Sequence, residues 1–370
     1  MLKISMQRES LLKPLQLVAG VVERRQTKPI LSHLLLTIED KLLTFIGTDM
    51  EIELHGFLHL EQTIKHPTQI TLPGKKFLDI CRSLPEEGIV ELTEDNGRIT
   101  VSCDRSRFVM SSLPAKEFPR APEQKPVMHF EVKQNALRKL IGKTSFSIPQ
   151  QDVRQYLNGL LFVIKDGAIQ TLATDGHRLA VHSVPAPIVD SSFAQVIIPR
   201  KGVVELLRLL EDSEEEVAVS FNSNLIQIKG KDFAFISKLI SGKFPNYNKI
   251  IPKKGEKKVT INCAELKSAL IRVGILSNEL FRSVHFRLRS NLLVLAANNP
   301  DQEEAVEELS IDYKEENIDT IFNIGYLLDI LNSIETETIN IFFNKGDAGV
   351  VIEDANSEPN CLYVLMPIRQ

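Results

Sequence analysis

The sequence predicts an α+β protein of three repeated domains, each an antiparallel sheet with two helices. Three observations predict it: paired apolar runs that return at nearly constant steps, amphipathic segments that keep those steps, and two linkers rich in proline and charge. A chain of 370 residues is also long for one core, since single cores stop growing at about 250–300 residues. We expect domains at 1–127, 128–256 and 257–370.

Each expected domain contains two apolar runs joined by a tight turn, which is the pattern of a β-hairpin. The runs span residues 33–47, 160–173 and 284–297, and the first two turns contain Asp40 and Asp166. The dipeptides that end the runs are separated by 126 and then 124 residues: Thr48-Asp49, Thr174-Asp175 and Asn298-Asn299. Phe118-Pro119 and Phe244-Pro245 also lie 126 residues apart.

Two amphipathic segments per domain have apolar residues at three- and four-residue spacing, which predicts helices. Linkers at 121–127 and 251–258 separate the domains. Because antiparallel sheets commonly bury one face, we expect the helices to cover one face of each sheet. The expected helices span residues 9–22, 74–84, 134–147, 199–210, 264–277 and 323–334.

The composition is that of a soluble globular protein, with 43% hydrophobic and 25% charged residues. No apolar run approaches the roughly 18 residues that a membrane span needs. Residues 1–10 are too polar for a signal peptide. The cysteines lie far apart, without the spacing of a zinc module or a disulfide framework: Cys81, Cys103, Cys263 and Cys361. We expect a cytoplasmic protein with no cofactor and no metal.

Charge is separated between the expected helices and the rest of the chain. Counted with the first extended to residue 25, the six segments hold 14 basic and 6 acidic residues, whereas the whole chain has 44 and 48. This predicts a positive surface on an acidic body, suited to phosphate contacts without base reading, although lysine-rich helix surfaces are also common. Helices about 10 Å wide would number about twelve around a duplex of roughly 20 Å, so two chains could close a ring.

Seven separated motifs resemble one known family, the bacterial sliding clamps, which are β subunits of DNA polymerase III. They are LATDGHRLAV, QDVRQYLNGLLF, IPRKGVVEL, GKFPNY, ILSNE, NNPDQEEA and the final YVLMPIRQ. The resemblance covers essentially the whole chain. It implies the DNA clamp fold and a head-to-tail homodimer, a six-domain ring that encircles duplex DNA. Implied partners, which bind through short peptides, are DNA polymerase subunits, the clamp-loader ATPase and repair proteins.

The resemblance also implies a hydrophobic peptide-binding pocket between the second and third domains. Apolar anchors of a peptide would fill it, and polar groups such as His177 and Arg178 would fix orientation. Lys249 and Gln370 depart from residues common in the family. The implied pocket residues are Leu157, Thr174, Gly176, His177, Arg178, Leu179, Pro245, Ile250, Val364, Met366, Pro367, Ile368 and Arg369.

Two further surfaces are implied by the resemblance. The subunit contact would pair apolar residues of the first domain with those of the third, and lysines with the acidic run 301–308, which taken alone resembles a solvated face. Its residues are Lys75, Lys76, Phe108, Met110, Ile275, Leu276, Asp301, Glu303, Glu304, Glu307 and Glu308. The implied DNA contacts are Arg24, Arg25, Gln151, Tyr156, Arg200 and Lys201, with Gln155 standing where some relatives have tyrosine.

The residues also allow two other classes of function. An enzyme could use residues 175–178 for acid-base work, but adjacent turn residues rarely converge on one reacting atom, and no catalytic motif is visible, so we assign no catalytic residue. A static duplex-DNA-binding structural protein is the alternative, and it would differ from a clamp in ignoring DNA ends. His55 and His59 are four apart in a strand-like stretch, where we expect a surface role and not a metal site.

Overall fold

The computed structural model describes residues 2–22, 28–123, 125–186, 193–249, 251–344, 348–355 and 361–368. It has two compact units. The first holds residues 1–135 and 204–239, and the second holds residues 136–203 and 240–370. Residues of the expected middle domain therefore occur in both units.

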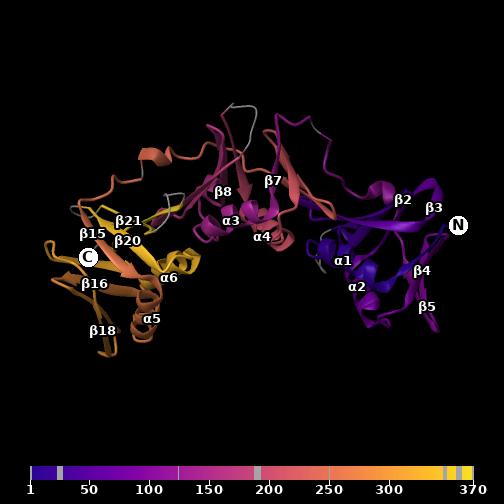
Figure 1. Cartoon of the computed structure of the whole chain (residues 1–370). Coiled ribbons are helices and arrows are strands. Elements are labelled where there is room, and N and C mark those ends of the chain that lie inside the picture. Colours follow the sequence, from indigo (N-terminus) through magenta and orange to yellow (C-terminus); the bar gives the residue numbers. More distant parts are fainter. Residues whose placement is uncertain are drawn as a thin grey trace. The chain divides into compact units, whose positions relative to one another are not determined.

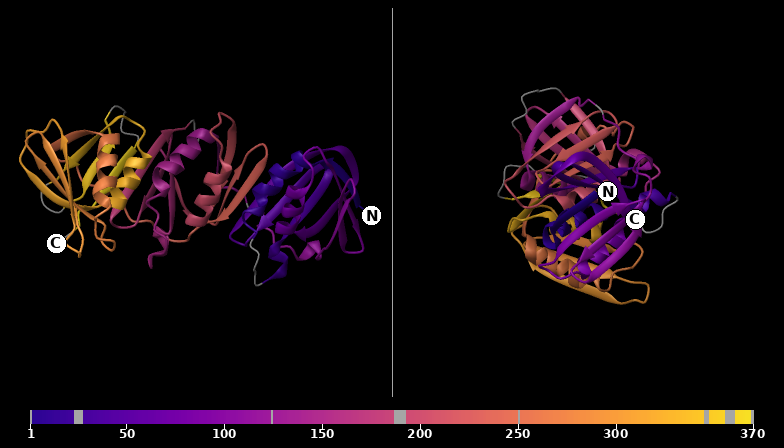
Figure 2. Two further views of the ribbon diagram at one scale, coloured as in Figure 1. Left: turned by 90° about the horizontal axis from the view of Figure 1, so that it is seen from below. Right: turned by 90° about the vertical axis from the view of Figure 1, so that its right-hand side faces the viewer.

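The first unit contains two antiparallel sheets and the neighbouring helices α1 (Arg8–Ala19) and α2 (Gly74–Ser83), seen in indigo in Figures 1 and 2. Short 3-10 helices lie at Pro29–Ser32 and Ala115–Glu117. The four-stranded sheet has the order β1 (Leu2–Gln7), β4 (Ile89–Asp95), β5 (Arg98–Cys103), β6 (Ser106–Ser111). The six-stranded sheet has the order β2 (His33–Thr48), β3 (Ile52–Pro73), β14 (Phe233–Lys238), β13 (Leu225–Lys229), β12 (Glu216–Phe221), β7 (Met128–Lys133).

The second unit also contains two antiparallel sheets, with helices α5 (Cys263–Gly274) and α6 (Ile324–Ser333) side by side (Figure 2). Short 3-10 helices lie at Gln155–Leu157 and Tyr247–Lys249. The eight-stranded sheet has the order β11 (Ala194–Pro199), β8 (Gly159–Lys165), β9 (Ala168–Thr174), β10 (Arg178–Pro185), β22 (Cys361–Leu365), β21 (Val350–Asp354), β20 (Thr338–Phe343), β15 (Lys257–Asn262). The four-stranded sheet has the order β18 (Glu304–Ser310), β17 (Leu292–Asn298), β16 (Ser283–Arg289), β19 (Ile318–Asn323).

All six predicted helices are present in the described residues, including α3 (Gln134–Ser145) and α4 (Arg200–Leu209), and every strand pairing there is antiparallel. The α+β class is confirmed. The opening helices of the first two repeats start 126 residues apart, so they keep the common step of the repeat. The sequence reasoning missed the strand that precedes each opening helix: β1, β7 and β15. Each is a six-residue stretch in which buried and exposed positions alternate, a signal that was available.

The first expected hairpin is assigned as one strand, β2, whose register with β3 shifts on both sides of Asp40. Asp40 has a φ of 52°, the same as Asp166 at the second repeat's turn. The pairs on either side also repeat: His33 faces Pro73 as Gly159 faces Pro199, and Thr48 faces Glu53 as Thr174 faces Leu179. The repeat of 126 residues is therefore a repeat of strand register.

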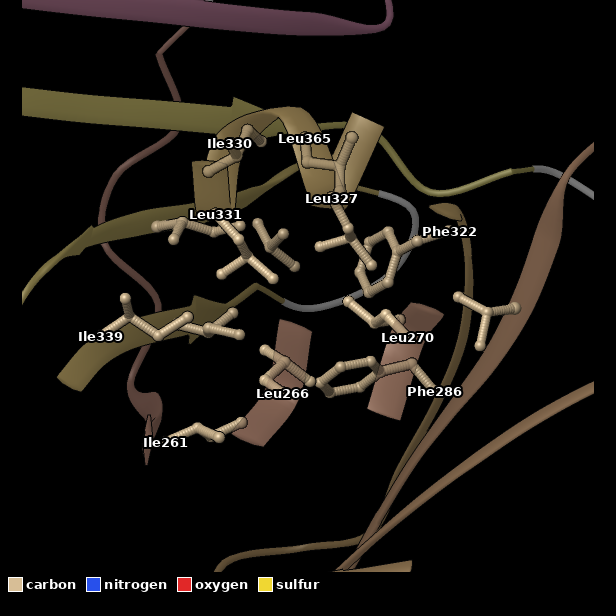
Figure 3. Close-up of a cluster of buried hydrophobic side chains, with 14 of the residues drawn as sticks. Ile261, Leu266, Leu270, Phe286, Phe322, Leu327, Ile330, Leu331, Ile339 and Leu365 are labelled. Carbon is tan, nitrogen blue, oxygen red and sulfur yellow. The ribbon is translucent and has the colours of Figure 1, made fainter. Parts of the chain in front are cut away.

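The sheets continue from one repeat into the next within each unit. Strand β3 of the first repeat pairs with β14 of the second, and β10 of the second pairs with β22 of the third. In the third repeat, α5 and α6 contribute Leu266, Leu270, Leu327 and Leu331 to a core shared with strands of both sheets (Figure 3). At about 1.5–3 kcal/mol per buried side chain, this core is the main source of that repeat's stability.

No helix among the described residues is long and apolar enough to cross a membrane. The four cysteines are free thiols with buried side chains. Within the same residues, no group of three or more histidine, cysteine or acidic side chains is placed to hold a metal ion.

Candidate functional site

A tight turn at residues 174–178 joins β9 to β10 and begins the predicted pocket. The Thr174 hydroxyl donates to the Arg178 carbonyl at 2.6 Å and accepts from the Gly176 amide at 3.1 Å. Asp175 Oδ1 accepts from the amides of His177 and Arg178 at 2.9 and 3.0 Å. Gly176 has a φ of 91°, where a side chain is strained. The turn is rigid and places the exposed His177 ring against Tyr326, with centroids 6.3 Å apart.

Arg178 is buried, and every nitrogen of its guanidinium has a partner in the second unit. Nε donates to Asp175 Oδ2 at 3.1 Å, Nη1 to Asp329 Oδ2 at 2.6 Å, and Nη2 to the Phe146 carbonyl at 2.8 Å. Its Cζ lies 4.4 Å from the Tyr326 ring centroid and 5.2 Å from that of Phe146. These contacts join β10, α6 and the segment after α3, and the orientation of a peptide by Arg178 stays a prediction.

The pocket residues Leu157, Leu179 and Val364 belong to one buried apolar cluster with Phe244. Leu179 faces Val364 across the β10–β22 pair, so the cluster lies where the second repeat meets the third. Tyr156 and Tyr247 pack against its edge and remain partly exposed. The cluster is therefore apolar, with two aromatic rings at its edge.

The chain after β22 contributes a second, less buried set of apolar residues. Met366, Pro367 and Ile368 are half-buried, as is Pro245. The Met366 amide donates to the His177 carbonyl at 2.8 Å, and the Ile368 amide to the Ile321 carbonyl at 2.8 Å. The first bond holds the segment against the 174–178 turn, and the second holds it against β19. Ile250, Arg369 and Gln370 lie outside the described residues, and Lys249 is exposed.

The implied DNA contacts fall in three segments of the chain, at residues 24–25, 151–156 and 200–201. Arg24 and Arg25 lie outside the described residues, whereas Gln151, Gln155 and Lys201 are exposed. Arg200 donates to the Ile148 carbonyl at 2.6 Å, so part of its guanidinium serves the fold.

Ion pairs also reduce the positive charge counted on the helices. Lys13 pairs with Asp232 at 2.9 Å, Arg272 with Glu307 at 2.7 Å, and Lys139 with Glu335 at 2.8 Å. The expected positive surface is therefore weaker than the residue count indicated.

In the implied subunit contact, Lys75 and Lys76 lie on α2, and Ile275 and Leu276 directly follow α5. Most of the other residues lie on an edge strand of each four-stranded sheet. In the first unit this is β6, where Arg107 is exposed and Val109 is 43% exposed. In the second unit it is β18, where Glu304 is exposed and Val306 is 53% exposed. One edge is basic and the other acidic, and each presents an apolar residue. The exposed valines and Arg107 were missed, although alternation along each strand indicated them.

The other residues of the implied contact differ in exposure and in their partners. Met110 is only 8% exposed. Glu307 is held by Arg272 through two hydrogen bonds of 2.7 and 2.8 Å, and Glu303 accepts from Asn299 Nδ2 at 2.6 Å. Lys75 and Phe108 are half-buried, and Lys76 is exposed. Ile275 is 76% exposed, and Leu276 beside it is half-buried.

A polar cavity of 390 Å³ in the first unit was not predicted. Glu53, 3% exposed, lies at its wall. Its Oε1 accepts from His55 Nε2 at 2.7 Å and from Arg120 Nε at 3.3 Å, and its Oε2 accepts from the Ala121 amide at 2.8 Å. Burial raises the pKa of Glu53, but the hydrogen bonds outweigh it, and the pKa lies below its ordinary value. His55 is thus a partner of a buried carboxylate, which corrects our expectation of a surface role; His59 is exposed.

Three repeats of two helices and antiparallel strands, with sheets continued from one repeat into the next, define a protein of the DNA clamp fold. The comparisons with known proteins agree. Residues 2–122, 131–246 and 248–369 match the N-terminal, central and C-terminal domains of the DNA polymerase III beta subunit. The chain belongs to this family, the beta sliding clamps, and its function is that of a DNA polymerase processivity factor.

Similar proteins cover the whole chain. The beta sliding clamp of Pseudomonas aeruginosa is 44% identical over 365 residues, 99% of each chain, and that of Escherichia coli K12 is 42% identical over 368 residues, 100% of each. A crystal structure of the P. aeruginosa beta subunit superposes with a TM-score of 0.97 at 42% identity over 100% of both chains. A structure of that organism's clamp bound to griselimycin has a TM-score of 0.96 at 43% identity, covering 100% of this chain and 99% of that one.

Proposed function

We propose that two copies of this chain close head to tail into a ring that encircles duplex DNA and tethers polymerases to it. The chain acts without catalysis of its own, in the cytoplasm, with domains at 1–127, 128–256 and 257–370. The observation that carries the proposal is the opposite charge of the two edge strands, β6 and β18.

Closure by these edges is physically reasonable. An edge strand exposes a row of backbone donors and acceptors that a second strand can pair with. Arg105 and Arg107 near β6, together with Lys75 or Lys76 of α2, would face acidic residues such as Glu304 and Glu308 of the other copy's β18. Since exposed ion pairs contribute only about 0–1 kcal/mol each, the apolar residues Val109, Val306 and Ile275 would supply most of the affinity.

Partner peptides would bind the second unit at the floor of Leu157, Leu179 and Val364, with the half-buried Met366 and Pro245 at its edges. Apolar anchors entering such a floor gain about 1.5–3 kcal/mol each. His177, exposed and stacked on Tyr326, would fix orientation. The partners proposed are DNA polymerase subunits, the clamp-loader ATPase and repair proteins.

DNA would be held loosely. Gln151, Tyr156 and Lys201, with Arg24 and Arg25, would contact phosphates in a manner that carries no sequence information. A positive surface partly neutralised by ion pairs suits sliding, because retention in a ring comes from the topological link and not from tight binding.

Retention on circular DNA tests the proposal. The protein is loaded with a clamp loader onto a nicked circle, and retention is measured before and after one double-strand cut. We expect release only after the cut. A static duplex-binding protein would instead be retained equally and would weaken smoothly with added salt.

The subunit contact is tested by Ile275→Ala with Leu276→Ala. Removing these apolar side chains of the proposed contact should shift the native mass from twice 41.7 kDa to that of a single chain. Sedimentation equilibrium measures the mass, and Val153→Ala, at a 98% exposed position outside the proposed contact, is the matched control. An unchanged dimer would remove the contact assigned here.

A further inference from the structure

The first unit contains a groove equivalent to the proposed peptide pocket of the second. The turn at residues 48–52 has the same four hydrogen bonds as the turn at 174–178. The Thr48 hydroxyl donates to the Ile52 carbonyl at 2.8 Å and accepts from the Met50 amide at 3.0 Å. Asp49 Oδ1 accepts from the amides of Glu51 and Ile52 at 2.9 and 2.7 Å. The next strand pair also agrees, because Glu53 faces Ile236 of β14 where Leu179 faces Val364 of β22.

The floors of the two grooves differ in chemistry. Leu179 and Val181 of the second unit both belong to the buried apolar cluster, whereas their equivalents in the first unit are Glu53 and His55. An apolar anchor placed on Glu53 would separate a buried carboxylate from its donors, at a cost of about 1–3 kcal/mol or more for each unsatisfied group. The same anchor placed on Leu179 meets only carbon.

The chain's own linker lies over the first groove. Ala121 and Arg120 follow Phe118-Pro119, the counterpart of Phe244-Pro245, and both donate to the Glu53 carboxylate. Cavities of 390 and 130 Å³ lie on either side of this contact. The residues that line both cavities form the wall between them: Glu53, Arg120, Ala121, Pro122, Leu225 and Ile236.

The linker of the second unit is tied differently. There the Tyr247 hydroxyl donates to Gln170 Oε1 at 2.9 Å, and the Ile251 amide donates to the Tyr247 carbonyl at 3.0 Å. The position equivalent to Glu53 is Leu179, which has no carboxylate to hold a linker. That linker instead packs Phe244, Tyr247 and Ile251 against the apolar cluster that contains Leu179. The second groove therefore lacks the carboxylate anchor that holds the linker of the first.

We propose that Glu53 is a specificity-determining residue: by holding linker residues 119–122 in the first groove, it closes that groove to apolar partner peptides and leaves one binding groove per chain. The inference rests on the proposed peptide pocket of the second unit. It assigns the first groove an occupant, the chain's own linker, and names the side chain that keeps it there.

Photo-crosslinking maps both grooves in one experiment. The probe is a synthetic hexapeptide with leucine and phenylalanine anchors and one photoreactive leucine, and crosslinked segments are identified by mass spectrometry. With the wild-type dimer we expect crosslinks at 174–181 and 361–368 and only background at 48–55 and 117–122. If no crosslinks form at 174–181 and 361–368, the proposed peptide pocket is contradicted. The proposal about Glu53 is judged separately, from the crosslinks at 48–55.

Two variants open the first groove by different routes. Glu53→Leu with His55→Val gives it an apolar floor, and Arg120→Ala with Ala121→Pro removes both linker donors without changing a strand. In each we expect crosslinking at 48–55 to rise at least about tenfold, the equivalent of 1.4 kcal/mol of affinity. Glu123→Gln, in the same linker but without a bond to Glu53, is the control and should stay at background.

Three results would overturn the proposal: wild-type crosslinking at 48–55 equal to that at 174–181, an equal rise in the Glu123→Gln control, or no rise in either folded double variant. Circular dichroism and native mass establish folding. If Glu53→Leu with His55→Val does not fold, Arg120→Ala with Ala121→Pro tests the proposal alone, because its two changes lie on a linker segment outside the sheets.

Discussion

The two units have the same turn and the same strand register, yet they stabilise the joint between neighbouring repeats in opposite ways. In the second unit a buried cation, Arg178, bonds two carboxylates and lies between two rings. In the first unit a buried anion, Glu53, collects donors from a histidine, an arginine and a backbone amide. A repeat can therefore preserve its backbone geometry while the chemistry of its joints changes, and the two equivalent grooves have floors of different polarity.

The largest expected effect comes from Arg178→Ala. The change leaves the largely buried Asp175 carboxylate without its cation, and breaking such a buried pair costs about 3–5 kcal/mol; Asp329, whose side chain is 45% exposed, adds little. Hydrogen exchange of β10 and β22 amides should accelerate accordingly, while β3 and β14 in the first unit keep their protection. Arg289→Ala, which removes an exposed pair with Asp319 in the same unit, is the control. If amide exchange accelerated equally in both units, the effect of Arg178 would not be confined to the second unit.

Acidification should loosen the second unit through His182. Burial, with Lys143 and Lys139 nearby, lowers the pKa of His182 to about 4, although Glu335 and a Leu140 backbone bond oppose the shift. The unfolded chain, with an ordinary pKa of 6.5, binds the proton more readily, so stability is full above pH 6.5 and falls as the pH drops toward 4. The loss reaches about 3 kcal/mol. Urea unfolding from pH 7 to 4 measures it, and His182→Asn should flatten the profile.

Glu53→Ala should destabilise the first unit by a smaller amount, about 2 kcal/mol, because it leaves the Ala121 amide and His55 without an acceptor. The pH dependence follows from the lowered pKa: the contribution is present above the ordinary value of 4.5 and is lost as the pH falls below it. Exchange of β3 amides at pH 7 provides the measurement. Acceleration confined to β10 would contradict the assignment of this joint to the first unit.

The sequence predicted the fold well because the repeat is written in local patterns: hairpin turns, helical spacing and a step of 126 residues. It also indicated which residues gather at β10 and β22. It could not indicate that Arg178 is buried and bonded to Asp329, because Asp329 lies 151 residues away and a buried arginine has no local sequence pattern. The cavity at Glu53 joins residues 53, 120 and 236, which only the tertiary fold brings together, although the 126-residue step from Leu179 already pointed to Glu53.

The smallest expected effect lies in the two turns. Met50 has a φ of 75° and Gly176 one of 91°, so the same left-handed position is occupied by a side chain in one unit and by none in the other. Gly176→Ala should cost about 1 kcal/mol, since its Cβ would also lie 3.2 Å from Arg154 Nη2. Met50→Gly relieves strain but loosens the unfolded chain, and the two terms nearly cancel. Thermal unfolding of both variants measures the change in the free energy of unfolding. If Met50→Gly destabilises the protein as much as Gly176→Ala does, the two turns share a register but differ in backbone strain.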